Sequence, residues 1–598
     1  MRRTVANASL LFPVLIAVAV FITFVPIVHN DFVNWDDPFY FVWNDRYRGL
    51  SFTNIKWMFT TLDFSHYQPL TWFTHGMVYT VWGLNPTAFH LGNLVMHIAN
   101  AVVLYYLLAH LLARRYPVSA PPASLAVPVA AAVGALFFAL HPLRVEPVAW
   151  ATERQGVTSA FFWLLAVYAY LRRQEYRDAR SRRGWYVLSI GCFILSLLAK
   201  SIGMTLPIVL LVLDVYPLRR IALRLQGLHP WLAGAAPPGL LHADAIGDTR
   251  RTQPRKGRHS TARGEAPGDS GRASIVVEKL PYLVAAAAAG VLALQAKQAR
   301  SLPSLAEHGM AERVVQATYG LCFYIWKTLL PTQLSPVYLL ERPLNPLAPA
   351  YVASLVVVAV VTVVLIALYR RWPWALAAWV CYALILFPVL GFTQSGVQKV
   401  ADRYTYLGCL PWAALVAAGT EQAWRSLARR GAGAVAAGCA TLVLLLAMLG
   451  MLAALQTRVW RDSLSMWDRV IEVEPRNHIA FNFRGTARRS KGDLSGARAD
   501  FERAVQLNPG YWEALVNRAH ARRVTGDLDG AIADYNELIR RDPRYAYGFN
   551  GRGRSRQAKG DLQGAVADFN QAIALAAPGS KERAEFEQNL NAVRRIKP

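Results

Sequence analysis

The stretch ASLLFPVLIAVAVFITFVPIV, residues 8–28, runs directly into HNDFVNWDDP, residues 29–38, and this junction decides the fold class. An apolar run of about 20 residues can cross a bilayer as a helix, because only a helix satisfies its own backbone hydrogen bonds in lipid. Residues 1–3 and the apolar run resemble a signal peptide, but no small-residue cleavage site follows. We therefore expect residues 8–28 to be a retained first span.

The composition excludes a soluble globular class. The 598 residues are 54% hydrophobic, and the mean hydropathy is +0.23. The net charge of +26 would ordinarily suggest nucleic acid as a partner. Here the basic residues lie largely in short loops between apolar runs, which is typical of the positive-inside rule, so we expect no nucleic-acid partner. The five cysteines have apolar neighbours and are interpreted as core residues rather than disulfides or a metal site.

About 11 apolar segments predict an all-α, polytopic membrane helix bundle over residues 1–456. The expected spans are residues 8–28, 88–112, 125–140, 157–171, 185–200, 203–218, 279–296, 349–369, 374–392, 404–422 and 433–455. Arginine-rich loops alternate correctly if residues 312–330 form a re-entrant or interfacial helix. The N-terminus is then cytoplasmic, and everything after Gln456 is outside. Abundant Arg and Ala suggest a bacterial inner membrane.

The segment 219–278 is rich in Arg, Gly, Pro and Ser and nearly lacks aromatic residues. It has too little apolar surface to offset the entropy of ordering, so we expect a disordered basic cytoplasmic loop. Its expected partner is the anionic lipid of the inner leaflet.

The last domain, residues 457–598, contains an internal repeat. Gly492-Asp493, Gly526-Asp527 and Gly560-Asp561 recur every 34 residues, in one register with Ala497, Ala531 and Ala565, with Phe501, Tyr535 and Phe569, and with Pro509 and Pro543. Small residues at a helix crossing, an aromatic residue one turn on and a closing proline are typical of tetratricopeptide repeats. Residues 463–474 fit as a partial leading repeat. We expect a periplasmic α-solenoid that holds a partner or acceptor, or else a stabilising cap.

Asp36 and Asp37 open a long polar loop after the first span, on the side away from the arginine-rich loops. Pro38 favours an extended backbone at Asp37, so the two side chains would diverge. One carboxylate could then face a cavity as a general base while the other pairs elsewhere. The alternative is an ordinary acidic loop.

Other polar residues fall on the same expected outer side. His66 and Gln68 are in the first loop, His97 faces inward from a span, and a later loop contains His141, Arg144, Glu146 and Glu153; Asp402 and Tyr404 stand in the last outer loop. For His97, helix-to-helix hydrogen bonding is favoured over a cavity lining. Arg154, Lys200 and Arg403 reach the outer side from distant places and suit a phosphate, although Lys200 could simply snorkel. No cluster has metal-ligand spacing, so no metal is predicted, and the need for a divalent ion stays open.

Five motifs carry a family resemblance. They are Trp35-Asp36-Asp37, residues 65–71 (SHYQPLT), residues 141–146 (HPLRVE), Leu198-Ala199-Lys200 and residues 401–407 (ADRYTYL). In this order, ahead of the repeats, they resemble bacterial relatives of the transmembrane-and-tetratricopeptide O-mannosyltransferases of the GT-C superfamily. The resemblance implies a GT-C-like bundle, a first-loop acid as catalytic base and a sugar linked to polyprenyl phosphate as donor. The chain departs from that pattern at Gln155-Gly156 and Ser201-Ile202.

We therefore expect an inverting transfer of sugar to a protein or glycan hydroxyl on the periplasmic face. Asp36 or Asp37 would act as base, and Arg154, Lys200 and Arg403 would stabilise the leaving phosphate. The main alternative is a non-catalytic, membrane-anchored repeat scaffold for envelope assembly. A flippase is less favoured because the polar residues gather on one side, and a polymer ligase is less favoured because the large outer loop comes early.

Overall fold

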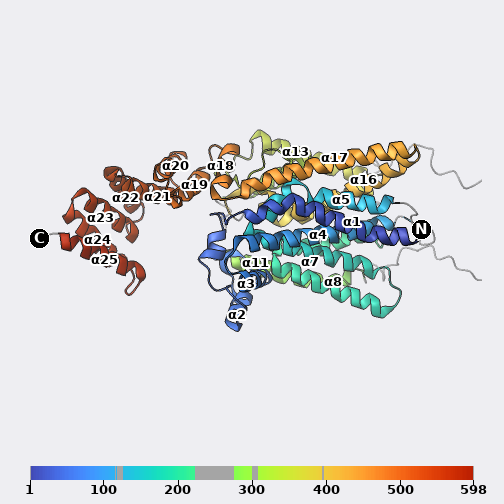
Figure 1. Cartoon of the computed structure of the whole chain (residues 1–598), viewed down its shortest axis with the longest axis horizontal. Coiled ribbons are helices and arrows are strands. Elements are labelled where there is room, and N and C mark those ends of the chain that lie inside the picture. Colours follow the sequence, from blue (N-terminus) through green and yellow to red (C-terminus); the bar gives the residue numbers. More distant parts are fainter. Residues whose placement is uncertain are drawn as a thin grey trace, which may run out of the picture.

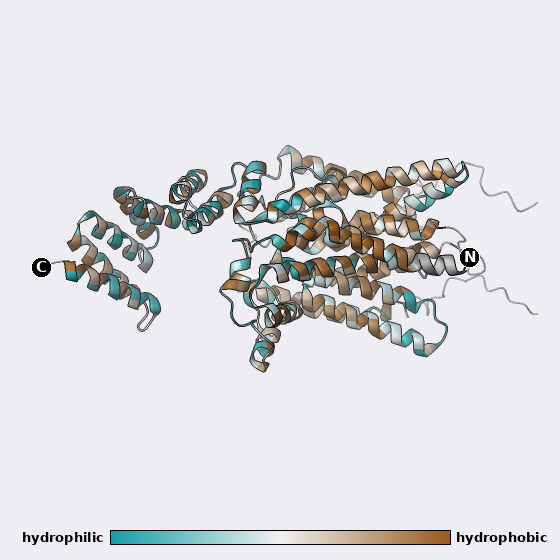
Figure 2. Ribbon diagram, viewed as in Figure 1, coloured by the Kyte–Doolittle hydropathy of each residue, from teal (hydrophilic) through white to brown (hydrophobic). Residues whose placement is uncertain are grey.

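The computed structural model describes residues 2–114, 116, 125–221, 275–298, 308–392 and 396–596. Within these ranges the chain is all-α apart from the antiparallel pair β1 (Tyr338–Leu339) and β2 (Gln398–Val400), in which Tyr338 faces Val400. A bundle of long helices is followed by a solenoid, which extends from the end of the bundle opposite the N-terminus (Figure 1). Hydrophobic residues dominate the bundle and hydrophilic residues the solenoid (Figure 2).

The bundle contains long helices joined by short helical turns. Its α-helices are α1 (Arg2–Phe24), α2 (Phe52–Thr60), α3 (Pro69–Trp82), α4 (Pro86–Ala113), α5 (Ala126–Ala139), α6 (Val145–Ala149), α7 (Arg154–Arg173), α8 (Ala179–Ala199), α9 (Leu206–Val215), α11 (Leu280–Gln298), α12 (Met310–Leu329), α13 (Pro349–Ala367), α14 (Pro373–Leu386), α15 (Thr405–Gly408), α16 (Leu410–Ala428) and α17 (Ala432–Thr457). The turns include η2 (Pro38–Val42), η3 (Asp63–Ser65), η5 (Ala151–Glu153), η6 (Ser201–Thr205), η8 (Phe387–Val389) and η9 (Asp402–Tyr404).

The expected count of about 11 spans is not supported. Six helical segments of the described chain are long and apolar enough to cross a membrane: Leu10–His29, Pro86–Ala113, Ala179–Ala199, Ile275–Lys297, Pro349–Ala367 and Ala432–Trp460. A seventh appears if α5 and the segment Pro142–Ala149, bent by 60°, count as one. Part of the difference arises because α5, α9 and α14 have only 14, 10 and 14 residues. Helices α7 and α16 have 20 and 19 residues but are not among the six. The segment expected to be re-entrant or interfacial, residues 312–330, coincides with helix α12 up to Leu329, and α12 is not among the six.

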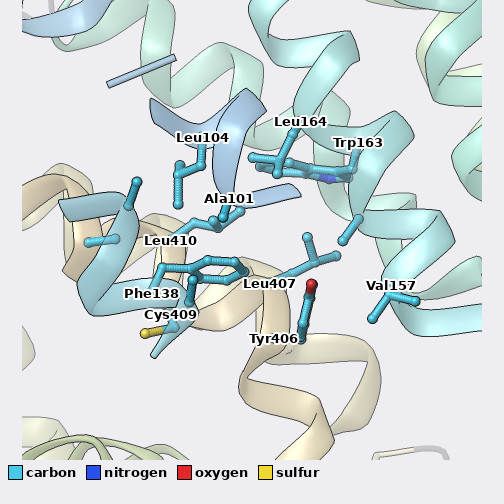
Figure 3. Packing of buried hydrophobic residues seen from close by; sticks show 14 of the residues in the cluster. Ala101, Leu104, Phe138, Val157, Trp163, Leu164, Tyr406, Leu407, Cys409 and Leu410 are labelled. Carbon is cyan, nitrogen blue, oxygen red and sulfur yellow. The ribbon is translucent and has the colours of Figure 1, made fainter. Parts of the chain in front are cut away.

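The core of the bundle surrounds Tyr406, whose ring lies among Phe138, Leu407 and other apolar side chains (Figure 3). The Tyr406 hydroxyl is 2.7 Å from Nδ1 of His97 and accepts a hydrogen bond of 2.9 Å from Asn100. Nε2 of His97 lies 3.1 Å from the Ala139 carbonyl. His97 therefore joins helices α4, α5 and α15 inside the core, because a buried polar group needs a partner.

The solenoid consists of α18 (Ser463–Val473), the pairs α19 (His478–Ser490) and α20 (Leu494–Leu507), α21 (Trp512–Val524) and α22 (Leu528–Arg541), α23 (Ala546–Lys559) and α24 (Leu562–Leu575), and α25 (Lys581–Ile596). Each repeated Gly-Asp dipeptide makes the turn within a pair. Gly492, Gly526 and Gly560 have φ near +84° to +90°, where glycine has no Cβ penalty. The aspartate that follows caps the next helix; Asp493, for example, accepts from the Gly496 amide at 2.8 Å.

The first loop of the bundle and the first helices of the solenoid share one core. Trp35 packs edge-on against Trp467 and Phe483, with ring centroids 5.2 and 5.1 Å away. The Asn34 side chain accepts from Trp467 Nε1 at 2.7 Å and donates to the Phe483 carbonyl at 3.0 Å. A second contact joins the bundle to the solenoid: Glu474, at the end of α18, accepts a hydrogen bond of 2.9 Å from the amide of Leu339 in β1. The repeats are therefore anchored on the loop that contains Asp36.

The predicted basic loop, 219–278, falls mostly on residues 222–274, which lie outside the described residues. Its two flanks meet in the described structure. Arg220 pairs with Asp214 at 2.9 Å and with Glu278 at 2.6 Å, and Lys279 pairs with Asp214 at 2.7 Å.

Candidate functional site

A cavity of about 1930 Å³ lies where the first loop, the last loop of the bundle and the first repeat meet. Six basic and four acidic residues line it in the described part of the chain: Lys200, Lys297, Arg342, Lys399, Arg403 and Arg476, and Asp36, Glu153, Glu341 and Glu474. The predicted residues His66, Gln68 and Tyr404 also line it. These residues come from eight separate stretches of sequence and share one polar chamber.

The structure separates the two first-loop carboxylates. Asp36 lines the cavity, whereas Asp37 does not and is fully buried. Asp37 accepts from the Val33 amide at 2.9 Å, from the Thr152 hydroxyl at 2.5 Å and from the Thr152 amide at 3.2 Å. Burial raises the pKa of Asp37 from 3.8 to about 7, although these hydrogen bonds act in the opposite direction.

The predicted extended backbone at Asp37 is wrong. Its φ of −56° and ψ of −38° are helical, despite the following proline. The reason is local, because the carboxylate bonds back to Val33, four residues earlier, and closes a turn. Asp36 nevertheless lines the chamber, whereas Asp37 does not.

Glu153 joins two of the predicted phosphate-binding cations. Lys200 Nζ lies 2.8 and 3.0 Å from its two carboxylate oxygens, and Arg403 Nε lies 3.6 Å away. Burial alone would raise the pKa of Glu153, but Lys200 and Arg403 outweigh it and hold that pKa below its ordinary value. The carboxylate therefore stays ionised and keeps both cations at the cavity wall.

Glu146 binds both the backbone amide and the guanidinium group of Arg403. The Arg403 amide donates to Glu146 Oε2 at 2.7 Å, and its guanidinium pairs with Glu146 Oε1. The guanidinium carbon also lies 5.3 Å from the Trp150 ring and 5.0 Å from the Tyr404 ring. Despite burial, the nearby carboxylates raise the pKa of Arg403, so it remains a fixed positive charge.

His66 and Gln68 line the chamber beside these cations. Burial, followed by the charges of Lys200 and Lys297, lowers the pKa of His66 to about 4, so its imidazole is neutral at pH 7. A neutral imidazole can accept or donate a hydrogen bond to a substrate. Gln68 donates to the Tyr40 hydroxyl at 3.1 Å.

Several predicted site residues lie outside the cavity wall. Arg154 donates to Asn93 Oδ1 at 2.7 Å and to the Phe89 carbonyl at 2.5 Å, so its guanidinium binds helix α4 rather than the chamber. Gly92 leaves the space for it, since a Cβ there would lie 2.4 Å from the guanidinium. The prediction for Arg154 failed because helix α7 begins at this residue and turns its side chain inward.

Four further residues have structural contacts instead of cavity contacts. His97 is in the core described above, and His141 Nε2 lies 3.0 Å from the Thr328 carbonyl. Arg144 is fully buried and donates to Thr405 Oγ1 at 2.8 Å. Asp402 accepts from the Tyr338 hydroxyl at 3.1 Å. Arg144 and Asp402 thus hold the segment that contains Arg403 against neighbouring parts of the bundle.

Sequence reasoning missed cavity residues on α11 and on the first repeat. Lys297 is the only charged residue of the apolar helix α11, and it lies in the last turn of that helix. Lys200 was predicted from the same kind of position, at the end of an apolar segment. Arg476, Asn477 and His478 had no such signal, because their role depends on how α19 docks on the bundle.

An apolar arm of the cavity continues between η6, α9, α11 and η8. Its lining includes Ile202, Met204, Ile208, Leu283, Ala286, Ala287, Gly290, Ala293, Leu294, Phe387 and Val389. Small residues on α11 keep this arm open, and α11 belongs to a segment apolar enough to cross a membrane. The cavity is thus polar beside the repeats and apolar where it follows a membrane helix.

Among the described residues, no group of three or more His, Cys, Asp or Glu side chains is arranged to hold a metal ion.

Comparison with known families identifies the repeats directly. A family model described as tetratricopeptide repeat matches residues 451–511 and 516–580. This confirms the repeat prediction. A structural match to the APC/C hetero-tetramer Cut9-Hcn1 has a TM-score of 0.21 and 13% identity over 87% of this chain and 92% of that chain, and it carries no argument.

Curated relatives extend the similarity into the bundle. Tmtc3 of Drosophila melanogaster, named a protein O-mannosyl-transferase, is 25% identical over 473 residues, covering 73% of this chain and 48% of that protein. Human TMTC2 and TMTC4, which have the same kind of name, are 28% and 27% identical over 159 and 183 residues. These two matches cover 26% and 30% of this chain, and 18% and 24% of the relatives. The chain spans at most about half the length of the curated relatives it matches.

Proposed function

We propose that this chain is a membrane glycosyltransferase that moves a sugar from a polyprenyl-phosphate donor to a hydroxyl group of a protein or glycan. Residues 1–456 would form the transferase domain, and residues 457–598 would form the acceptor-side repeat domain. The reaction would take place at the outer face of a bacterial inner membrane.

One observation carries the proposal: the cavity joins a cationic chamber to an apolar arm along a membrane helix. A lipid-linked sugar phosphate has the same two parts, a charged head and a hydrocarbon chain. Lys200 and Arg403 stand in the chamber, and Gly290 and Leu294 line the arm. The distant similarity to proteins named O-mannosyl-transferases agrees with this assignment.

The chemistry follows from the placement of Asp36. Its carboxylate would take the proton of the acceptor hydroxyl as the oxygen forms a bond to the anomeric carbon. The bond from that carbon to the phosphate oxygen breaks, and its electron pair leaves with the polyprenyl phosphate. Attack opposite the leaving group inverts the configuration of the sugar.

Lys200 and Arg403 would stabilise the negative charge that grows on the departing phosphate. Both are fixed before the reaction by Glu153 and Glu146, so little reorganisation is needed at the transition state. Arg403 is stacked on Trp150 and cannot swing away without losing two contacts. Arg154, bound to helix α4, is left out of this role.

A donor panel tests the proposal. Purified full-length protein is incubated with polyprenyl phosphates that carry different radiolabelled sugars, together with hydroxyl-bearing peptide and glycan acceptors. We expect transfer from at least one lipid-linked donor and none from the corresponding nucleotide sugars. The scaffold alternative would be favoured by two results together. Folded protein would transfer no sugar from any donor in the panel, and cells that carry the Asp36→Asn variant would assemble their envelope normally.

A further inference from the structure

Two sets of arginines in the repeats differ in their partners. The first set recurs at 34-residue spacing and pairs with a buried aspartate in the same repeat: Arg484 and Arg488 with Asp500 at 2.6 and 3.0 Å, Arg518 and Arg522 with Asp534 at 2.6 and 3.1 Å, and Arg552 and Arg556 with Asp568 at 2.7 and 2.9 Å. Each of these six arginines therefore has an acidic partner within the fold. Each pair of arginines joins the two helices of a repeat.

The second set consists of Arg489, Arg523 and Arg554, on helices α19, α21 and α23. In the described part of the chain none of these three forms an ion pair with a carboxylate. Arg489 donates to Asn517 Oδ1 at 3.2 Å, and Arg523 contacts His520 Nε2 at 3.3 Å. We call the surface around these three arginines and His520 the arginine face.

The members of the arginine face are close enough to influence one another. Burial, then Arg523, Arg489 and Arg554, lowers the pKa of His520 to about 4. Burial and the charge of Arg554 lower the pKa of Arg523. The cations therefore repel one another, and an anion placed between them would relieve that repulsion.

A polar line connects the arginine face with the cavity. His478, Asn482 and Arg489 lie on one side of α19, because their spacing of 4 and 7 residues brings them to the same face of a helix. Asn517 bridges Arg489 to Asn482, its Nδ2 donating to Asn482 Oδ1 at 2.9 Å. His478 lines the cavity, and Arg489 follows about 16 Å along the helix by the rise of 1.5 Å per residue.

We propose that the arginine face binds an acidic stretch of extended polypeptide, whose carboxylates pair with Arg489, Arg523 and Arg554. Guanidinium groups match carboxylates in two-pronged hydrogen bonds, and the asparagine amides can donate to and accept from a peptide backbone. A stacked solenoid offers a long surface for such a segment. The binding site stands without the proposed function; together with it, the acidic stretch would flank the acceptor hydroxyl.

The surroundings favour a peptide over other anions. Trp512 and Tyr545 pack on each other with ring centroids 4.9 Å apart, so these rings are not open platforms for nucleic-acid bases. The solenoid extends away from the end of the bundle (Figure 1), so its later repeats lie apart from the helices that are apolar enough to cross a membrane. A lipid headgroup is therefore a poor match.

The test measures binding without any sugar donor. Full-length protein in detergent is titrated with a fluorescent peptide of alternating Glu and Ser, and with the same peptide carrying Gln for Glu. The triple variant Arg489→Gln, Arg523→Gln and Arg554→Gln is compared with Arg503→Gln, Arg540→Gln and Arg594→Gln. The second variant loses the same charge at exposed arginines on α20, α22 and α25.

We expect the acidic peptide to bind wild type and the control variant equally, and the arginine-face variant at least about tenfold more weakly, as suits the loss of charge-assisted hydrogen bonds. The Gln peptide should bind weakly to all three. Equal loss in both triple variants would show a non-specific charge effect and overturn the proposal. Stronger competition by single-stranded nucleic acid or anionic vesicles than by unlabelled acidic peptide would also overturn it. Circular dichroism confirms that each variant is folded.

Discussion

Trp35 and Trp467 pack edge-to-face with ring centroids 5.2 Å apart, although 432 positions separate them in the sequence. Trp35 immediately precedes Asp36, and Trp467 belongs to the first helix of the solenoid. The repeats therefore hold the cavity loop in place by direct contact. The position of the proposed base depends on a domain that does not itself contain it.

Loss of this contact should impair transfer at a distance. We expect Trp467→Phe to lower kcat several-fold and Trp467→Ala to lower it further, since removal of a buried Trp costs about 3–5 kcal/mol. Trp512→Ala, which removes a ring pair within the repeats, is the control. Initial rates at saturating donor measure the effect. Unchanged rates in folded Trp467→Ala protein would show that the repeats do not position Asp36.

Asp37 should make stability depend on pH. Its pKa is raised to about 7 in the fold, so the protonated form is favoured there. The contribution is therefore complete below about pH 4 and is lost as pH rises to about 7, with a slope of about 1.4 kcal/mol per pH unit between these values. We expect the melting temperature of wild type, relative to Asp37→Asn, to fall from pH 4.5 to 7 and to level off above it.

The matched control for this experiment is Asp63→Asn, which replaces an exposed carboxylate at the start of η3. If the difference between wild type and Asp37→Asn is constant across this range, Asp37 is ionised throughout and the assignment of its proton is wrong.

Lys200 should act on the transition state more than on substrate binding. We expect Lys200→Met to reduce kcat by ~10²–10³-fold with little change in KM, as for other groups that stabilise a developing anion. Glu153 keeps Arg403 as a partner at 3.6 Å, so the wall should remain folded. Lys200→Arg should recover part of the rate, and Lys56→Met, at an exposed lysine on α2, should not change it. A large rise in KM with normal kcat would contradict this role.

Gly290 offers a direct test of the apolar arm. A Cβ at Gly290 would meet nothing within 4 Å, yet the residue lines the cavity, so a larger side chain can enter the arm without a clash. We expect Gly290→Phe to raise KM for a long-chain donor about tenfold, the equivalent of roughly two buried methylene groups.

A short-chain donor should be unaffected by Gly290→Phe, because its chain would not reach the arm. Gly191→Phe on α8 is the control, since a Cβ there also meets nothing within 4 Å and the residue is outside the cavity lining. Equal effects on long and short donors would argue against a lipid chain in this arm.

Periodic features of the chain were predictable from sequence. The 34-residue register of Gly492, Gly526 and Gly560 predicts the solenoid because each residue has a fixed task in a turn. Long apolar runs predict helices because a helix satisfies its own backbone hydrogen bonds in lipid. Each expected span coincides with a helical segment of the structure. Their number as full spans was overestimated, since apolar composition does not reveal that a helix such as α9 ends after 10 residues.

The candidate site was less predictable, because it depends on side-chain direction and on distant contacts. Lys200 and Arg403 line the cavity, whereas Arg154 donates to Asn93 on helix α4. Sequence spacing placed Asp36 and Asp37 together but could not show which one Thr152 would cover. The contribution of His478 depends on docking between two domains, which no local pattern encodes.

The central claim is that Asp36 is the base in a chamber that binds a lipid-linked sugar phosphate. The most direct measurement compares sugar transfer by purified wild type, Asp36→Asn and Asp45→Asn, an exposed carboxylate of the same loop, with one polyprenyl-phosphate donor. We expect Asp45→Asn to match wild type and Asp36→Asn to lose ~10²–10⁴-fold in kcat while still binding the donor. Full activity in folded Asp36→Asn protein would contradict the claim.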